Sequence, residues 1–118
     1  EAAKQAVHDR SLLATYSSED DMLMARDGKL ASVDALIQLT RSRIESTETR
    51  LREYAAEAAE FERSGKPVPN ALQDQIKTAR ELITENREFV RQKEIEREGI
   101  SAQFDADIAR YRELTEDE

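Results

Sequence analysis

Three carboxylates come closer to metal chemistry than any other residues of this chain. Glu53, Glu57 and Glu60 recur at intervals of four and three, which places them on one face of a helix. Carboxylates on helix faces hold paired metal ions in some four-helix bundles, but those sites also need Glu-x-x-His motifs. The single histidine, His8, lies far away in the sequence. We therefore expect no metal site.

Other catalytic patterns are missing as well. The chain has no Cys, which removes thiol nucleophiles, disulfides and thiolate metal ligands. It has no glycine-rich phosphate loop, no Gly-x-Ser-x-Gly and no zinc-ligand spacing. A composition that is 37% charged, with three Gly and two Pro, is typical of long helices without a deep interior. We expect no enzyme activity and no cofactor.

The strongest pattern is a seam of mostly apolar side chains at alternating steps of three and four residues. Such steps bring the side chains to one stripe of a helix, the a and d positions of a coiled coil. The seam positions are Leu30, Val33, Ile37, Thr40, Ile44, Thr47, Leu51, Tyr54, Ala58 and Phe61, then Leu72, Ile76, Ala79, Ile83, Asn86, Val90, Lys93, Arg97, Ile100, Phe104, Asp107, Tyr111 and Leu114. The pattern predicts two long helices.

The stretch between the two seams predicts a sharp turn. Gly65 can adopt the positive φ that ends a helix, Pro67 and Pro69 prevent its continuation, and Asn70 with Gln73 has the spacing of a helix cap. We predict an all-α fold: a long antiparallel helical hairpin in a single domain. It comprises a short N-terminal helical arm over 1–16, a first long helix over 17–64, a turn over 65–70 and a second long helix over 71–118.

The N-terminal arm has no seam partner in such a hairpin. It nevertheless carries Leu12, Leu13 and Tyr16, so it either packs on the open end of the hairpin, pairs with a second copy, or frays. The following residues look like a helix start capped by Ser18, although the seam spacing also fits one continuous helix with a kink.

Polar residues interrupt the seam near its middle and near its open end. Thr40, Thr47, Asn86, Lys93 and Arg97 stand at core positions, where polar side chains reduce stability and specify register and partner. Residues equidistant from the turn should be neighbours, which predicts an ion pair between Arg26 and Asp107.

Several apolar side chains fall outside the seam. The clearest are Leu36, Leu39, Leu82, Phe89 and Ile95, with Met22, Met24 and Ile108 nearer the ends. A cluster of such residues indicates a second apolar face. That face would be covered by joining two hairpins into a four-helix bundle, by a partner helix, or by wider packing within one hairpin. The interaction residues that we predict are Leu12, Leu13, Tyr16, Leu36, Leu39, Phe89 and Ile95.

The charge distribution argues against nucleic acid as a partner. The net charge is −8, and most of it lies in residues 1–28 and 101–118, which meet at the open end of an antiparallel hairpin. Phosphate backbones and anionic lipid surfaces are repelled by such a region. No run of apolar residues is long enough for a membrane span. We expect protein partners, the first of them a second copy.

Five segments resemble a group of small coiled-coil proteins of Gram-negative bacteria that have no assigned function. They are Arg10-Ser11-Leu12-Leu13-Ala14-Thr15-Tyr16, Glu19-Asp20, Arg26-Asp27 with Leu30, the turn Gly65-Lys66-Pro67-Val68-Pro69, and Tyr111-Arg112-Glu113-Leu114. Members of the group usually carry a signal peptide. The resemblance implies a periplasmic location after removal of a leader, and a cytoplasmic location stays open.

Together these features predict a non-enzymatic scaffold or adaptor of the cell envelope that self-associates and binds proteins. The alternative is a holdase-like periplasmic chaperone, which would grip unfolded clients with the apolar arm and the helical faces.

Overall fold

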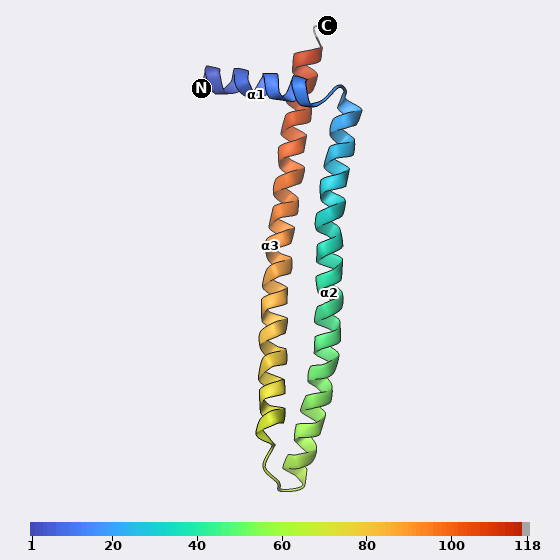
Figure 1. Ribbon diagram of the computed structural model, residues 1–118, viewed down its shortest axis with the longest axis vertical. Helices are drawn as coiled ribbons and strands as arrows, with labels where there is room; N and C mark the ends of the chain where they lie inside the picture. The colour runs from blue at the N-terminus through green and yellow to red at the C-terminus, as the bar shows by residue number, and fades with distance from the viewer. Residues whose placement is uncertain (117–118) are drawn as a thin grey trace. The chain divides into compact units, whose positions relative to one another are not determined.

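The computed structural model describes residues 1–116 and contains three helices in that range, with no strand there. Helix α1 spans Ala2–Thr15, α2 spans Glu19–Arg63 and α3 spans Asn70–Thr115 (Figure 1). The predicted all-α helical hairpin is confirmed, while its dimerisation stays a prediction. The chain divides into two compact units. Unit 1 combines Glu1–Asp34 with the part of α3 from Ile95 onward, and unit 2 is Ala35–Glu94.

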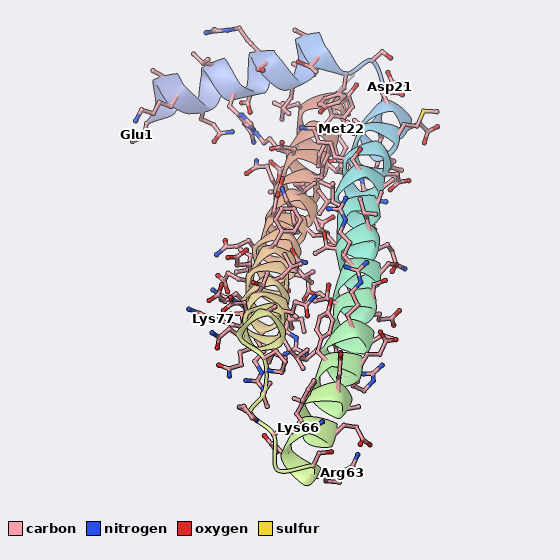
Figure 2. The ribbon with its side chains drawn as sticks, turned by 60° about the horizontal axis from the view of Figure 1, so that its bottom comes forward. Glu1, Asp21, Met22, Arg63, Lys66 and Lys77 are labelled. Atoms are coloured by element: carbon pink, nitrogen blue, oxygen red, sulfur yellow. The ribbon has the colours of Figure 1, made fainter. Side chains whose placement is uncertain are left out.

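Unit 2 is an antiparallel hairpin closed by the predicted turn. The end of α2 has the hydrogen bonds of a Schellman motif, with the Lys66 N–H donating to the Phe61 carbonyl at 2.9 Å and the Gly65 N–H to the Glu62 carbonyl at 3.1 Å. Gly65 has a φ of +70°, a left-handed conformation that glycine adopts without steric cost. Arg63 and Lys66 flank this turn (Figure 2).

The start of α3 differs from the predicted cap. Helix α3 already includes Asn70, and the first helical bond runs from the Gln73 N–H to the Pro69 carbonyl at 3.1 Å. The Gln73 side chain donates to the Val68 carbonyl at 2.9 Å instead of reaching the Asn70 N–H. Pro69 thus holds the position that we expected for Asn70, and it offers only its backbone carbonyl, because proline has no side-chain oxygen to accept a hydrogen bond.

The core of unit 2 is the predicted seam. Every seam side chain of this unit is buried or half-buried, and the buried ones come from both helices. These are Ile37, Thr40, Ile44 and Thr47 from α2, and Leu72, Ala79, Ile83 and Val90 from α3. Burial of a Val, Leu or Ile side chain contributes about 1.5–3 kcal/mol, so this stripe is the main stabilising feature of unit 2.

The two buried threonines are satisfied within their own helix. The Thr40 hydroxyl donates to the Leu36 carbonyl at 2.8 Å, and the Thr47 hydroxyl donates to the Arg43 carbonyl at 2.9 Å. Neither hydroxyl forms a hydrogen bond with the other helix. Each is therefore a polar group in the core that does not contribute to the contact between the helices. A valine at either position would leave no polar group unpaired, because the carbonyl keeps its backbone bond.

We expect Thr47→Val to raise the free energy of unfolding by about 1 kcal/mol, since a buried methyl replaces a hydroxyl. Urea unfolding followed by circular dichroism measures the change. Thr49→Val is the matched control: the Thr49 hydroxyl makes the same bond, to the Glu45 carbonyl at 3.1 Å, but its side chain is exposed. Equal changes in the two variants would contradict a seam position for Thr47.

Unit 1 contains α1, the start of α2 and the end of α3. The chain breaks between α1 and α2, and the Asp21 N–H donates to the Ser18 hydroxyl at 3.2 Å. Ser18 is therefore the cap that we predicted, and the alternative of one continuous helix is wrong. Acidic residues fill the first turn of α2, where the helix dipole favours them: Glu19, Asp20 and Asp21.

Met22 is the centre of the unit 1 core. Its side chain, labelled in Figure 2, has no exposed surface. It packs with Leu12 of α1 and with Ile108 and Tyr111 of α3. Tyr16 and Leu23 lie against this cluster. The arm thus folds back on its own chain, which was one of the three alternatives for it.

The predicted Arg26–Asp107 ion pair is wrong. Arg26 instead contacts the neighbouring Asp27 at 3.1 Å, and Asp107 lies 3.0 Å from the His8 ring nitrogen of α1. Because the arm occupies this side of α3, Asp107 has a nearer partner. A different pair joins α2 and α3 in unit 1, with the Arg97 guanidinium 2.6 Å from the Asp34 carboxylate.

Candidate interaction surfaces

The hairpin of unit 2 has two unlike flanks, and the first is closed by ion pairs between the helices. Arg41 of α2 lies 2.8 Å from Glu94 of α3, and Glu48 of α2 lies 3.7 Å from Arg87 of α3. Each of these residues directly follows a seam position in the sequence. We call this side the closed flank.

The opposite side carries exposed apolar residues. Leu36, Leu82 and Phe89 each directly precede a seam position, and in antiparallel helices these positions share one flank. Their exposed fractions are 42%, 40% and 39%, and Leu39 beside them is 48% exposed. We call this side, with its four apolar side chains, the open flank. Single exposed leucines are ordinary, whereas four along one flank of a short hairpin indicate an interaction surface.

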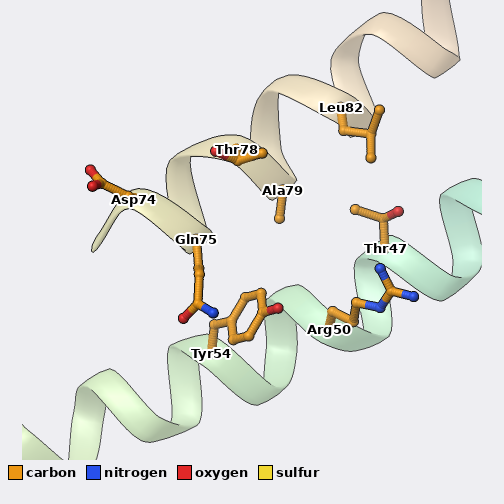
Figure 3. Close-up of a pocket in the computed structure, with 8 residues that line it drawn as sticks. All are labelled: Thr47, Arg50, Tyr54, Asp74, Gln75, Thr78, Ala79 and Leu82. Atoms are coloured by element: carbon orange, nitrogen blue, oxygen red, sulfur yellow. The ribbon is translucent and has the colours of Figure 1, made fainter. Parts of the chain in front are cut away.

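A shallow groove follows the open flank between the two helices. One part is lined by Thr47, Arg50, Tyr54, Asp74, Gln75, Thr78, Ala79 and Leu82, as Figure 3 shows. A second part is lined by Leu39, Ser42, Arg43, Ser46, Thr47, Arg50, Leu82 and Asn86. The parts share residues and form one groove, which is hollow where the short side chains of Ser42, Ser46 and Thr78 stand.

Two guanidinium groups on the open flank are unpaired. Among residues 1–116, neither Arg43 nor Arg50 makes an ion pair, although both line the groove. On the closed flank, by contrast, Arg41 and Arg87 are each paired with a glutamate. The open flank therefore offers leucine side chains and positive charge together, which suits an apolar surface that bears carboxylates.

The arm in unit 1 is held by a second set of contacts. The Arg110 guanidinium donates to both carboxylate oxygens of Asp9, at 2.8 and 2.7 Å. Leu12 is the one buried residue of α1, so a single apolar side chain and a few polar contacts attach fourteen residues. Figure 1 shows α1 crossing the C-terminal part of α3.

The Arg110 contact makes Asp9 a stronger acid. The pKa of Asp9 is lowered to about 2, chiefly by the hydrogen bond from Arg110 and also by the hydrogen bond from the Gln5 amide, against the opposing effect of desolvation. The pKa of Arg110 is raised, chiefly through the same hydrogen bond. A carboxylate whose pKa is depressed on folding stabilises the folded form above its ordinary pKa, and that contribution is lost as the pH falls.

We expect the arm contact to persist at neutral pH and to weaken between an ordinary carboxylate pKa of about 4 and a pH of about 2. Carbon-13 NMR titration of the Asp9 carboxyl measures this pKa. Arg110→Gln should return it toward the ordinary value, whereas Arg112→Gln, which removes the partner of Glu19, should not. An unchanged Asp9 titration in Arg110→Gln would mean that α1 does not rest on α3 in solution.

The predicted interaction residues fall into different environments. Leu12 is buried and Tyr16 is half-buried, so these two help to attach the arm, whereas Leu13 is 45% exposed. Leu36, Leu39 and Phe89 lie on the open flank of unit 2, while Ile95 is exposed in unit 1. Their roles in binding a partner stay predictions.

Sequence reasoning missed three members of the open flank as interaction residues: Leu82, Arg43 and Arg50. Leu82 was recognised as lying outside the seam, but the two arginines were not singled out. The available signal was their place directly before the seam residues Ile44 and Leu51, which puts them on the same flank as Leu82.

No metal-binding chemistry is assembled by the part of the chain that the structure describes. Across residues 1–116, no three His, Cys, Asp or Glu side chains come together in a way that could hold a metal ion, and Glu53, Glu57 and Glu60 are exposed on α2. Within the same range, none of the helices combines the length and apolarity needed to cross a membrane.

Comparison with known proteins identified no relative of this chain. No family model matches the chain, and no curated protein or solved structure matches it.

Proposed function

We propose that this protein is a non-enzymatic scaffold that acts through self-association and protein binding along the open flank of unit 2. One observation carries the proposal: the two flanks of the same hairpin differ in kind. Interhelical ion pairs cover the closed flank, while four apolar side chains and two unpaired arginines stand on the open flank.

The energetics favour a protein partner for this surface. Burial of the exposed part of each of the four side chains contributes about 1 kcal/mol. The partner surface contributes free energy in the same way when its own apolar side chains are buried. The total stabilisation has to exceed the several kcal/mol that association costs. A partner helix or helical hairpin can cover the whole row at once, because its own apolar stripe follows the same spacing.

Site-specific photo-crosslinking in the source cell tests the proposal. We expect photoreactive benzoylphenylalanine at Leu39 or Leu82 to give protein adducts. The matched positions are Arg41 of the closed flank and Thr84, which lies beside Glu48 and Arg87 of the same flank, and both should give few adducts. Absence of adducts at both open-flank positions, with the variants folded by circular dichroism, would overturn the proposed function.

A holdase-like chaperone is the second candidate, favoured by exposed apolar side chains in unit 1. Val7 and Leu13 of α1 are 57% and 45% exposed, and Met24 is 72% exposed. Leu12, however, is turned into the core and is unavailable to a client. Aggregation of reduced insulin separates the two functions: a holdase suppresses it at near-stoichiometric concentration, and the scaffold leaves it unchanged.

We place this scaffold in the cell envelope, a proposal supported by the resemblance to signal-peptide-bearing coiled-coil proteins. Fractionation of the source cell with a periplasmic marker tests it, and recovery in the cytoplasmic fraction would contradict it. The binding proposal does not depend on the outcome.

A further inference from the structure

On the basis of the proposed function, we propose that the occupant of the open flank is the open flank of a second copy. The two hairpins lie face to face about a twofold axis parallel to their helices and form a four-helix bundle. Such an axis places α2 of one copy against α3 of the other, at the same height along the helices.

The ion pairs of the closed flank give the heights of the side chains. Glu48 pairs with Arg87, so these two residues stand at the same level. Because the helices are antiparallel, the residue two positions before Glu48 is level with the residue two positions after Arg87. The residue two positions after Glu48 is likewise level with the residue two positions before Arg87. Ser46 is therefore level with Phe89, and Arg50 is level with Glu85.

Two matched contacts follow from these levels. Phe89 protrudes from α3 with 39% of its surface exposed, and Ser46 of the facing α2 leaves a hollow in the groove. Arg50 is an unpaired cation, and Glu85 is an exposed anion without an ion pair among residues 1–116. The twofold axis repeats each of these two contacts, so the dimer contains two Phe89–Ser46 contacts that match in shape and two Arg50–Glu85 contacts that match in charge.

The other face-to-face arrangement lacks this match. A twofold axis perpendicular to the helices sets α2 against α2 of the second copy. When this axis passes midway between Arg43 and Arg50, the two arginines approach the same two arginines of the partner, and like charges that meet across an interface oppose association. The parallel axis is the arrangement that the charges favour.

Charge reversal tests the contact between Arg50 and Glu85. We expect the wild-type protein to sediment as a dimer at equilibrium, and Arg50→Glu or Glu85→Arg alone to raise the dimer dissociation constant about tenfold or more. An equimolar mixture of the two variants should recover the dimer, because each chain then supplies the charge that the other needs at both contacts. The double variant should recover it too.

Arg52→Glu is the matched control, since it makes the same charge change on α2 beside Glu48 and Arg87 of the closed flank. It should leave the dissociation constant within about twofold of the wild type. Ser46→Trp fills the hollow at an exposed position, so it should weaken the dimer while helix content stays unchanged.

A wild-type protein that stays monomeric, or a dimer that is insensitive to Arg50→Glu, Glu85→Arg and Ser46→Trp, would overturn this inference. The photo-crosslinking result is separate. Adducts with other proteins at Leu39 and Leu82, together with a monomeric wild type, would retain the scaffold and assign the open flank to a different partner. Adducts of twice the chain mass support the second copy.

Discussion

Ile83→Asp is expected to lower the free energy of unfolding by more than about 3 kcal/mol. Ile83 is 6% exposed in the seam of unit 2, close to the buried Ala79 on its own helix. A carboxylate there loses its water without gaining a partner, and the contacts of the isoleucine are lost as well. Urea unfolding monitored by circular dichroism at 222 nm measures the change. If the variant is already partly unfolded without urea, the resulting loss of helix agrees with this expectation.

Thr84→Asp is the control for this substitution. Thr84 is the next residue on α3, its side chain is exposed, and its hydroxyl donates only to the Arg80 carbonyl of its own helix. A change within about 1 kcal/mol is expected, from helix propensity alone. If Ile83→Asp cost no more than Thr84→Asp, the seam would not be the core of unit 2.

Met22→Asp is the second substitution with a large expected effect, and it acts on unit 1. Met22 has no exposed surface and joins α1 to α3 through Leu12, Ile108 and Tyr111. We expect a loss of more than about 3 kcal/mol from this cluster, because the charge is buried without a partner. The arm depends on one buried side chain of its own, so it should detach first.

Hydrogen exchange measured by mass spectrometry checks this outcome. Exchange should increase in α1, at the start of α2 and in the C-terminal part of α3, where the cluster lies. Met24→Asp is the control, since Met24 is two residues away on the same helix and 72% exposed. Protection of α1 that survives Met22→Asp would show that the polar contacts of Asp9 and His8 are sufficient to hold the arm.

The sequence by itself determined the helices, the seam and the turn, because each depends on local spacing. Side chains repeated at steps of three and four can be buried together in only one way, and their burial is worth several kcal/mol. Gly65 and the prolines that follow it exclude a helix whatever the rest of the chain does. The helix start at Asn70 was misassigned by one residue: Pro69 precedes α3, and only its backbone carbonyl accepts a helical hydrogen bond.

Only the tertiary structure decided the place of the arm and the character of the flanks. Leu12 could have met its own chain or a second copy, and no periodicity distinguishes the two. Asp107 could have paired with Arg26, but the arm brings His8 closer. Exposed ion pairs differ by less than about 1 kcal/mol from their alternatives, so the choice among them depends on which backbones come near. Among residues 1–116, the closed flank has ion pairs and the open flank has none for the same reason: the fold places oppositely charged side chains of α2 and α3 beside one another on the closed flank.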